Sequence, residues 1–156
     1  METKHNLRKA LLVADGGSTK TDWCLAVPHR EPQLFRTRGL NPALLEPPAI
    51  REILQTELLP RLAPHLQGPE TETHIYYYGA GCLPSVCDKM GQALTGLFPR
   101  STAEVHSDLL GAARALCGHE AGIACILGTG SNSCRYDGQD IVQHAVSYTH
   151  LRAHET

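Results

Sequence analysis

The sequence predicts an α/β fold that opens with an antiparallel meander and continues with parallel strands and helices. Short apolar runs at residues 7–14, 22–27 and 33–37 are separated by turn residues and predict three antiparallel strands. From residue 47 onward, helical and strand patterns alternate, which is typical of parallel strands joined by right-handed crossovers. After Gly118 the chain starts again with a strand, a glycine turn and a hairpin. This second start predicts a second, related domain of which only the first strands are present.

The elements after the meander each follow from a local pattern. Pro47 and Pro48 open a predicted helix over residues 49–59, because proline is favoured in the first helical turn. Apolar periodicity and glycine or proline breaks then predict the following segments: a loop at 65–73, a strand at 74–78, a helix at 84–98, a strand at 102–105, a helix at 109–117 and a strand at 122–127. Asp137-Gly138 is a two-residue turn signal and predicts a hairpin of residues 133–136 and 140–142.

The composition is typical of a globular protein that binds neither membranes nor nucleic acid. The 156 residues are 42% hydrophobic and 19% charged, with a formal net charge of -2. No run approaches the roughly 20 apolar residues of a membrane span, and the short apolar run at 10–14 is not a signal peptide. The six cysteines lack the C-x-x-C spacing of a zinc site. We therefore expect a cytoplasmic protein with reduced cysteines.

One segment, LLVADGGSTKTDW, carries the strongest functional signal. It predicts a strand, a glycine turn and a second strand. Gly16 and Gly17 allow backbone N–H groups to approach an anion without an intervening Cβ, and Ser18 and Thr19 add hydroxyl donors. Asp15 is placed to hold the cation that accompanies a phosphate. The alternative is a plain hairpin with a Gly-Gly turn.

Three common nucleotide and hydrolase motifs are excluded. No segment has the G-x-x-x-x-G-K-[ST] spacing of a Walker A loop. The dinucleotide fingerprint fails at Ser133, where its last glycine is required, and the hydrolase elbow fails at Lys20.

Asp108 is the leading candidate for a catalytic carboxylate. It follows a predicted strand and begins a predicted helix. It can be a general base, because ligands bind at the carboxyl ends of the strands in open α/β sheets. It can equally be a helix N-cap that accepts backbone N–H groups. Both roles can hold at once.

Two further segments have both a functional and a structural interpretation. The turn at residues 128–131 follows a strand, so its N–H groups can wrap a second phosphate or simply close a hairpin. Asn41, in the sequence GLNP, can hydrogen-bond a sugar hydroxyl or serve as a turn residue.

Taken together, the segments ADGGSTKTDW, RGLNP, YYYGAGC and SDLLGAARALCGHEAGIACILGTGSNSC resemble one family. They are similar to the N-terminal half of N-acetylglucosamine kinase-type enzymes of the BadF/BadG/BcrA/BcrD ATPase family, within the sugar kinase, actin and heat-shock chaperone superfamily. The resemblance runs from about residue 7 to residue 143. It implies a ribonuclease H-like ATPase domain with helices on both faces of the sheet, and ATP-dependent phosphorylation of an amino sugar or related sugar.

The resemblance also implies site residues. Asp108 matches the base that takes the proton from the attacking sugar hydroxyl, and Asp15 lies near magnesium, through water. Asn41 and Asn132 match positions that contact the sugar, as does Asp108. The two phosphate turns match Asp15, Gly16, Gly17, Ser18, Thr19 and Lys20, and Gly128, Thr129, Gly130 and Ser131. ATP and Mg²⁺ are the implied cofactors, and a homodimer of the intact protein is left open.

The chain departs from the family near its end. A Gly-Asp-Glu-Gly segment is expected after the strand at 140–143, but the chain reads AVSYTHLRAHET and stops. We expect residues 1–117 to form an N-terminal kinase domain, 118–145 to begin a second domain, and 146–156 to be a foreign tail. On this basis the fragment alone is expected to be inactive, since catalysis needs two domains closing on the nucleotide.

Two other functions are alternatives. An ATPase activator of the same family would carry an iron–sulfur cluster, for which Cys117 and Cys125 are candidates without a cluster spacing. A non-catalytic sugar-sensing regulator would use the same fold, usually together with a helix-turn-helix segment, and none precedes Leu7.

Overall fold

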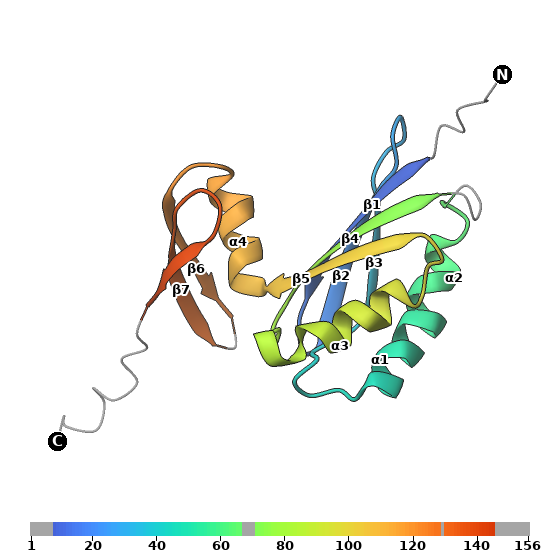
Figure 1. Ribbon diagram of the computed structural model, residues 1–156, viewed down its shortest axis with the longest axis horizontal. Helices are drawn as coiled ribbons and strands as arrows, with labels where there is room; N and C mark the ends of the chain where they lie inside the picture. The colour runs from blue at the N-terminus through green and yellow to red at the C-terminus, as the bar shows by residue number, and fades with distance from the viewer. Residues whose placement is uncertain (1–7, 67–70, 129, 146–156) are drawn as a thin grey trace. The chain divides into compact units, whose positions relative to one another are not determined.

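A computed structural model describes residues 8–66, 71–128 and 130–145 of the chain. These residues fall into two compact units, Met1–Asp108 and Leu109–Thr156 (Figure 1). The predicted tail at 146–156 lies outside the described residues. Among the described residues, no helix has the length and apolar character needed to cross a membrane.

The first unit is built on a five-stranded mixed sheet. Its strands are β1 (Lys9–Gly16), β2 (Lys20–Ala26), β3 (Gln33–Arg38), β4 (Glu72–Gly79) and β5 (Ser101–Ser107), in the spatial order β3-β2-β1-β4-β5. The first three strands pair antiparallel, whereas β4 runs parallel to β1 and β5 runs parallel to β4. The predicted meander followed by parallel strands is therefore confirmed.

Strand ends differ from the prediction by a few residues. β1 continues through Asp15 and Gly16, which we expected in the turn, because Gly16 pairs with Thr21 on one side and with Gly79 on the other. Two neighbouring strands thus extend the hydrogen-bonded ladder beyond the point where the apolar run stops.

The helices of the first unit cover one face of its sheet (Figure 1). They are α1 (Pro47–Ile53), the π-helix η1 (Leu54–Leu58), α2 (Leu59–Leu62) and α3 (Pro84–Thr95). The predicted helix at 49–59 is therefore longer and includes a π-turn, in which the Leu59 N–H bonds the carbonyl of Leu54. Pro60 explains this widening, because its ring crowds the carbonyl four residues earlier and it has no N–H to donate.

The core lies between this helical layer and alternate residues of the strands. In β1 and β4 the buried positions alternate with more exposed ones, so every second side chain faces the helices. The buried set includes Ala10, Leu12, Ala14, Ile75, Tyr77, Ile50, Leu54, Leu58, Met90 and Leu94. The opposite face of the sheet carries Leu11, which is 39% exposed, and Leu34, which is 78% exposed. We expected helices on both faces of the sheet. Among the described residues, helices cover one face of this sheet.

The second unit is a three-stranded antiparallel sheet with one helix. It contains β6 (Gly122–Leu127), β7 (Ser131–Tyr136) and β8 (Ile141–His144), in that spatial order. The helix α4 (Asp108–Cys117) packs on this sheet through a shared buried cluster: Leu109, Leu110, Ala113, Ala124, Cys134 and Tyr136. The Tyr136 hydroxyl donates to the carbonyl of Gly118 at 3.1 Å. Because of this packing, α4 groups with the second unit, whereas we expected the first domain to end after residue 117.

Candidate functional site

The turn between β1 and β2 is a tight hairpin with unused donors at its tip. The Gly17 N–H donates to the carbonyl of Lys20 at 2.8 Å and closes the turn. Ser18 and Thr19 are exposed. No acceptor in the described part of the chain takes the backbone N–H of Ser18 or Thr19. The turn is therefore a hairpin, as one of the two interpretations of the sequence predicts. The hairpin also leaves the N–H groups of Ser18 and Thr19 able to bind an anion.

A second loop supports this turn from one side. The Gly39 N–H donates to the carbonyl of Thr19 at 2.9 Å, and the Leu40 N–H donates to the carbonyl of Gly17 at 3.1 Å. A Cβ at Gly39 would lie 2.1 Å from the carbonyl oxygen of Ser18, so only glycine permits this approach. The turn is thus held by backbone hydrogen bonds and by close packing.

Three strands of the first unit end in one row at the edge that carries this turn. Gly16 of β1 pairs with Gly79 of β4, and Gly79 pairs with Ser107 of β5. Since neighbouring strands lie about 4.8 Å apart, Ser107 is about 10 Å from Gly16. Asp108 follows Ser107 directly and is half-buried. Asp108 and the glycine turn therefore share one edge of the sheet.

The charge of Asp108 acts on Cys82, in the loop after β4. Burial raises the pKa of Cys82 to about 12, and the neighbouring Cys87 and the charge of Asp108 contribute to the shift. Asp108 is also the only acidic residue in the first turn of α4, where the helix dipole favours a negative charge. Asp108 thus lies at the N-terminus of a helix.

Tyr77 is buried beneath the strand ends at Gly16 and Gly79. Its hydroxyl donates to the carbonyl of Leu40, and its ring fills the space in which side chains at Gly16 and Gly79 would lie. Burial raises the pKa of Tyr77 far above its usual range, so the hydroxyl remains a donor. Trp23 packs at 6.0 Å from the Tyr77 ring and donates through Nε1 to Thr37 at 3.1 Å.

Asn41 is buried and joins three loops at this edge. Its Nδ2 donates to Ser18 Oγ at 2.9 Å, and its Oδ1 accepts from the Ala43 N–H at 3.0 Å. Gly81, in the loop after β4, has φ of 73°, and a Cβ there would lie 1.9 Å from Asn41 Oδ1. Asn41 therefore fills the junction between the glycine turn and its two neighbouring loops.

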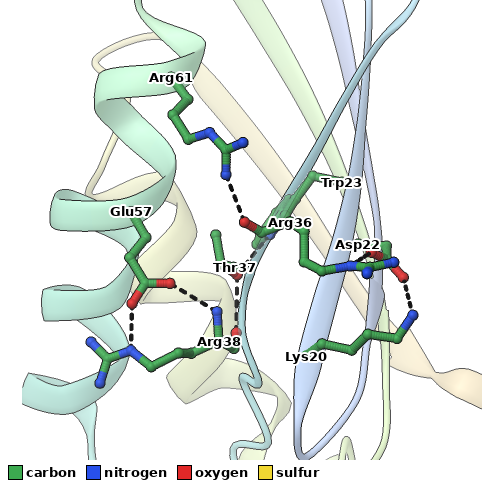
Figure 2. Close-up of polar contacts among 8 residues, drawn as sticks. All are labelled: Lys20, Asp22, Trp23, Arg36, Thr37, Arg38, Glu57 and Arg61. Atoms are coloured by element: carbon green, nitrogen blue, oxygen red, sulfur yellow. Dashed lines mark hydrogen bonds and ion pairs between the residues drawn. The ribbon is translucent and has the colours of Figure 1, made fainter.

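Charged side chains of β2 and β3 form pairs beside the turn. Figure 2 shows Lys20 and Arg36 pointing at Asp22, with Lys20 Nζ at 2.8 Å and Arg36 Nε at 2.6 Å from its carboxylate oxygens. These hydrogen bonds, that of Arg36 first, lower the pKa of Asp22. Lys20, predicted as a phosphate ligand, thus contacts a carboxylate on its own strand.

Asp15 lies next to this pair, opposite Asp22 in the β1–β2 register. Its carboxylate is exposed, on the sheet face that the helices leave open. One exposed carboxylate beside free backbone donors fits a cation held mainly by water and phosphate oxygens. No cluster of three or more His, Cys, Asp or Glu that could hold a metal ion occurs within residues 8–66, 71–128 and 130–145.

The second glycine turn lies in the second unit and has a similar form. The Gly128 N–H donates to the carbonyl of Gly130 at 2.9 Å, and Leu127 pairs with Ser131 across the hairpin. Thr129 lies outside the described residues. Asn132 is exposed, and its Oδ1 accepts from the Ser133 N–H at 2.9 Å.

Sequence reasoning missed two residues of the first site. The alternation within Tyr76-Tyr77-Tyr78 indicates that one ring faces the core, but the contact of Tyr77 with Leu40 joins segments 37 residues apart. The two glycines of GAGC indicate that Gly81 can adopt a positive φ. Its contact with Asn41 could not be read from the sequence, because the two residues are 40 positions apart.

Comparison with models of protein families gave no match, and comparison with curated proteins gave none. Comparison with solved structures gave clear matches. The chain is 42% identical to a "putative N-acetylglucosamine kinase" from Porphyromonas gingivalis, with a TM-score of 0.80 over 90% of this chain and 49% of that one. A "putative N-acetylglucosamine kinase" from Chromobacterium violaceum is 19% identical, with a TM-score of 0.58 over 81% of this chain and 44% of that one.

A more distant match shows the fold alone. The non-polymerising mutant of MamK bound to AMPPNP is 13% identical, with a TM-score of 0.58 over 85% of this chain and 51% of that one. The predicted ribonuclease H-like ATPase fold is therefore confirmed, as is the resemblance to N-acetylglucosamine kinase-type proteins. The chain spans about half the length of the solved structures it matches.

Proposed function

We propose that this chain, a relative of N-acetylglucosamine kinase-type proteins along 90% of its length, supplies the N-terminal part of an ATP-dependent sugar kinase. The substrate class is an amino sugar of the N-acetylglucosamine type. The observation that carries the proposal is the shared sheet edge: the unused N–H groups of Ser18 and Thr19 follow β1, and Asp108 follows β5, with β4 between these two strands.

This arrangement suits phosphoryl transfer, which depends mainly on positioning and on donors around the phosphate. The N–H groups of the turn bind phosphate oxygens of ATP. Asp108 accepts the proton of the sugar hydroxyl as the hydroxyl oxygen attacks the γ-phosphorus and the bond to the ADP oxygen breaks. The products are the sugar phosphate and ADP, and the proton stays on Asp108 until it passes to water.

Magnesium and the second turn complete the proposed chemistry. Asp15 would hold Mg²⁺ through water, and the ion would neutralise charge on the phosphates. Gly128, Thr129, Gly130 and Ser131 form the second phosphate turn. In the first unit, Asn41 and Asp108 are assigned to the sugar, and in the second unit Asn132 is assigned to it; the remaining half of the relatives' length supplies further contacts to both substrates.

A chimaera provides the sharpest test. Residues 8–145 replace the matching part of the P. gingivalis protein, and ADP release is measured with N-acetylglucosamine and MgATP. We expect turnover that Asp108→Asn abolishes while ATP binding persists, because the amide keeps the shape of the carboxylate but cannot accept the proton. Asp88→Asn, an exposed acid on α3, is the matched control and retains turnover.

Two outcomes contradict the proposal. Turnover that survives Asp108→Asn removes the assigned base. A chimaera that binds ATP and sugar without ADP release, beside an active P. gingivalis parent, removes the kinase function. The chain alone is expected to show no turnover, and ATP-dependent phosphorylation by the purified chain would contradict the need for the second half.

A further inference from the structure

Asn41 has a defined amide orientation because one of its partners has fixed polarity. The backbone N–H of Ala43 can only donate, so the amide atom 3.0 Å from it is the oxygen. The other end of the amide, which faces Ser18 Oγ at 2.9 Å, is therefore the NH₂ group. The tight packing of Gly81 against the amide holds it in place.

This orientation determines what the Ser18 hydroxyl can do. An amide NH₂ only donates, so Ser18 Oγ must be the acceptor in this hydrogen bond. The hydroxyl hydrogen of Ser18 is then directed away from Asn41. Ser18 is exposed at the tip of the turn, beside the unused N–H groups of Ser18 and Thr19. A third donor is thus left available at the place where two backbone donors are already unused.

We propose that Asn41 is a positioning residue that turns the Ser18 hydroxyl into an oriented donor for a phosphate oxygen of the bound nucleotide. The inference rests on the proposed function, because it assigns the anion to ATP. It gives Asn41 a role toward the phosphate turn in addition to its predicted contact with the sugar. The buried amide is fixed before the ligand arrives, so the donor needs no reorganisation on binding.

A double-mutant cycle in the chimaera with the P. gingivalis protein tests the inference, because the proposed function assigns further ATP contacts to the second half. Asn41→Asp replaces the NH₂ by an oxygen that accepts the Ser18 hydrogen and turns it inward. Its negative charge also repels ATP, but that repulsion is present in the Ser18→Ala background as well. We expect Asn41→Asp to weaken MgATP binding, measured by calorimetry, about 10-fold more in the wild-type background than in the Ser18→Ala background. An equal loss in both backgrounds overturns the proposal.

A second measurement does not depend on nucleotide. The side-chain amide protons of Asn41 are followed by NMR in the wild-type chain and in Ser18→Ala, a change at an exposed residue. We expect an upfield shift and faster exchange of these protons in Ser18→Ala, and Thr19→Ala as the neighbouring control leaves them unchanged. If Ser18→Ala changes neither the chemical shift nor the exchange rate of the Asn41 amide protons, the inference is overturned even if ATP binds.

The two failures are distinguishable. If the chimaera with the wild-type residues binds no MgATP, the proposed function and the phosphate part of the inference fail together, whereas NMR still reports on the Asn41–Ser18 contact. If MgATP binds with equal affinity to the chimaera with the wild-type residues and to its Ser18→Ala variant, the nucleotide function stands and the role of Asn41 is overturned.

Discussion

The ring of Tyr77 occupies the space that any side chain at Gly16 would need: a Cβ at Gly16 would lie 2.0 Å from the Tyr77 hydroxyl oxygen. The same ring would lie 2.4 Å from a Cβ at Gly79, the partner of Gly16 in the β1–β4 register. One buried aromatic side chain therefore explains two glycines at the end of two neighbouring strands. Gly16 is thus required for packing, whatever it contributes to ligand binding.

The first prediction concerns this packing. Gly16→Ala should destabilise the chain by about 1–3 kcal/mol, because Tyr77 must move and its hydrogen bond to Leu40 is disturbed. Urea unfolding followed by tryptophan fluorescence measures the change, since Trp23 packs on Tyr77. Gly130→Ala, in the second hairpin, is the matched control, because a Cβ there meets nothing within 4 Å. Equal stability of wild type and Gly16→Ala would disprove the packing argument.

A second prediction isolates the hydroxyl of Tyr77. Tyr77→Phe keeps the ring that packs on Gly16 and Gly79 but removes the donor to the buried Leu40 carbonyl. The expected loss of stability is about 1–3 kcal/mol, the cost of leaving a buried carbonyl without a partner. Tyr76→Phe, on the open face of the same strand, should change stability little. If both variants unfold at the same denaturant concentration, the Tyr77 hydrogen bond contributes nothing.

The succession of strands and helices along the chain could be predicted because the signals behind it are local. Alternation of apolar residues marks β1 and β4, and turn residues mark the hairpins, without reference to the rest of the chain. The packing of Tyr77 and the role of Asn41 could not be predicted, since each depends on segments that only the folded chain brings together. The π-turn at Leu54–Leu58 could have been suspected from Pro60, which follows an otherwise regular helical pattern.

In the candidate site, too, the features with local signals could be predicted and those that depend on distant segments could not. The position of Asp108 at the end of a strand was predictable from the local pattern, and the parallel pairing of β1, β4 and β5 brings it to the edge that carries the glycine turn. The ion pair between Lys20 and Asp22 could not be predicted, because a spacing of two residues along the chain does not determine which side chain each one contacts. Conversely, the exposed face of the first sheet was unexpected, since the family resemblance implied helices on both faces.

A third prediction concerns acid stability. Figure 2 shows Glu57 of η1 beside Arg38 of β3, and its carboxylate accepts from the Arg38 backbone N–H at 2.8 Å and from Arg38 Nε. These bonds, the backbone one first, lower the pKa of Glu57 below its ordinary value of 4.5. Because the folded-state pKa is the lower one, the contribution of Glu57 is fully present above pH 4.5 and is lost as the pH falls through the folded-state pKa.

Glu57→Gln should therefore reduce the stability of the chain at neutral pH and flatten its fall below pH 4.5. The expected effect is small, because both side chains are partly exposed. Unfolding midpoints between about pH 3 and pH 7 measure it, and Glu31→Gln, an exposed acid between β2 and β3, is the control. An unchanged pH profile in Glu57→Gln would show that the Arg38 contact does not couple to folding.

A fourth prediction concerns the free edge of the second sheet. β6 is an edge strand among the described residues, and its sequence GIACIL contains no charge that would discourage pairing with another chain. Ile123 and Leu127 are 74% and 86% exposed on the face away from α4. By contrast, the edge strand β3 of the first sheet carries Arg36 and Arg38, both held in ion pairs.

The purified chain is therefore expected to self-associate with rising concentration, through β6. Ile123→Lys places a charge on this strand and should shift the population toward monomer in analytical ultracentrifugation. Leu44→Lys, at an equally exposed leucine in a loop of the first unit, should leave the association unchanged. A chain that stays monomeric and melts sharply at every concentration would show that the β6 edge is already protected, and an equal response to both lysines would place the contact elsewhere.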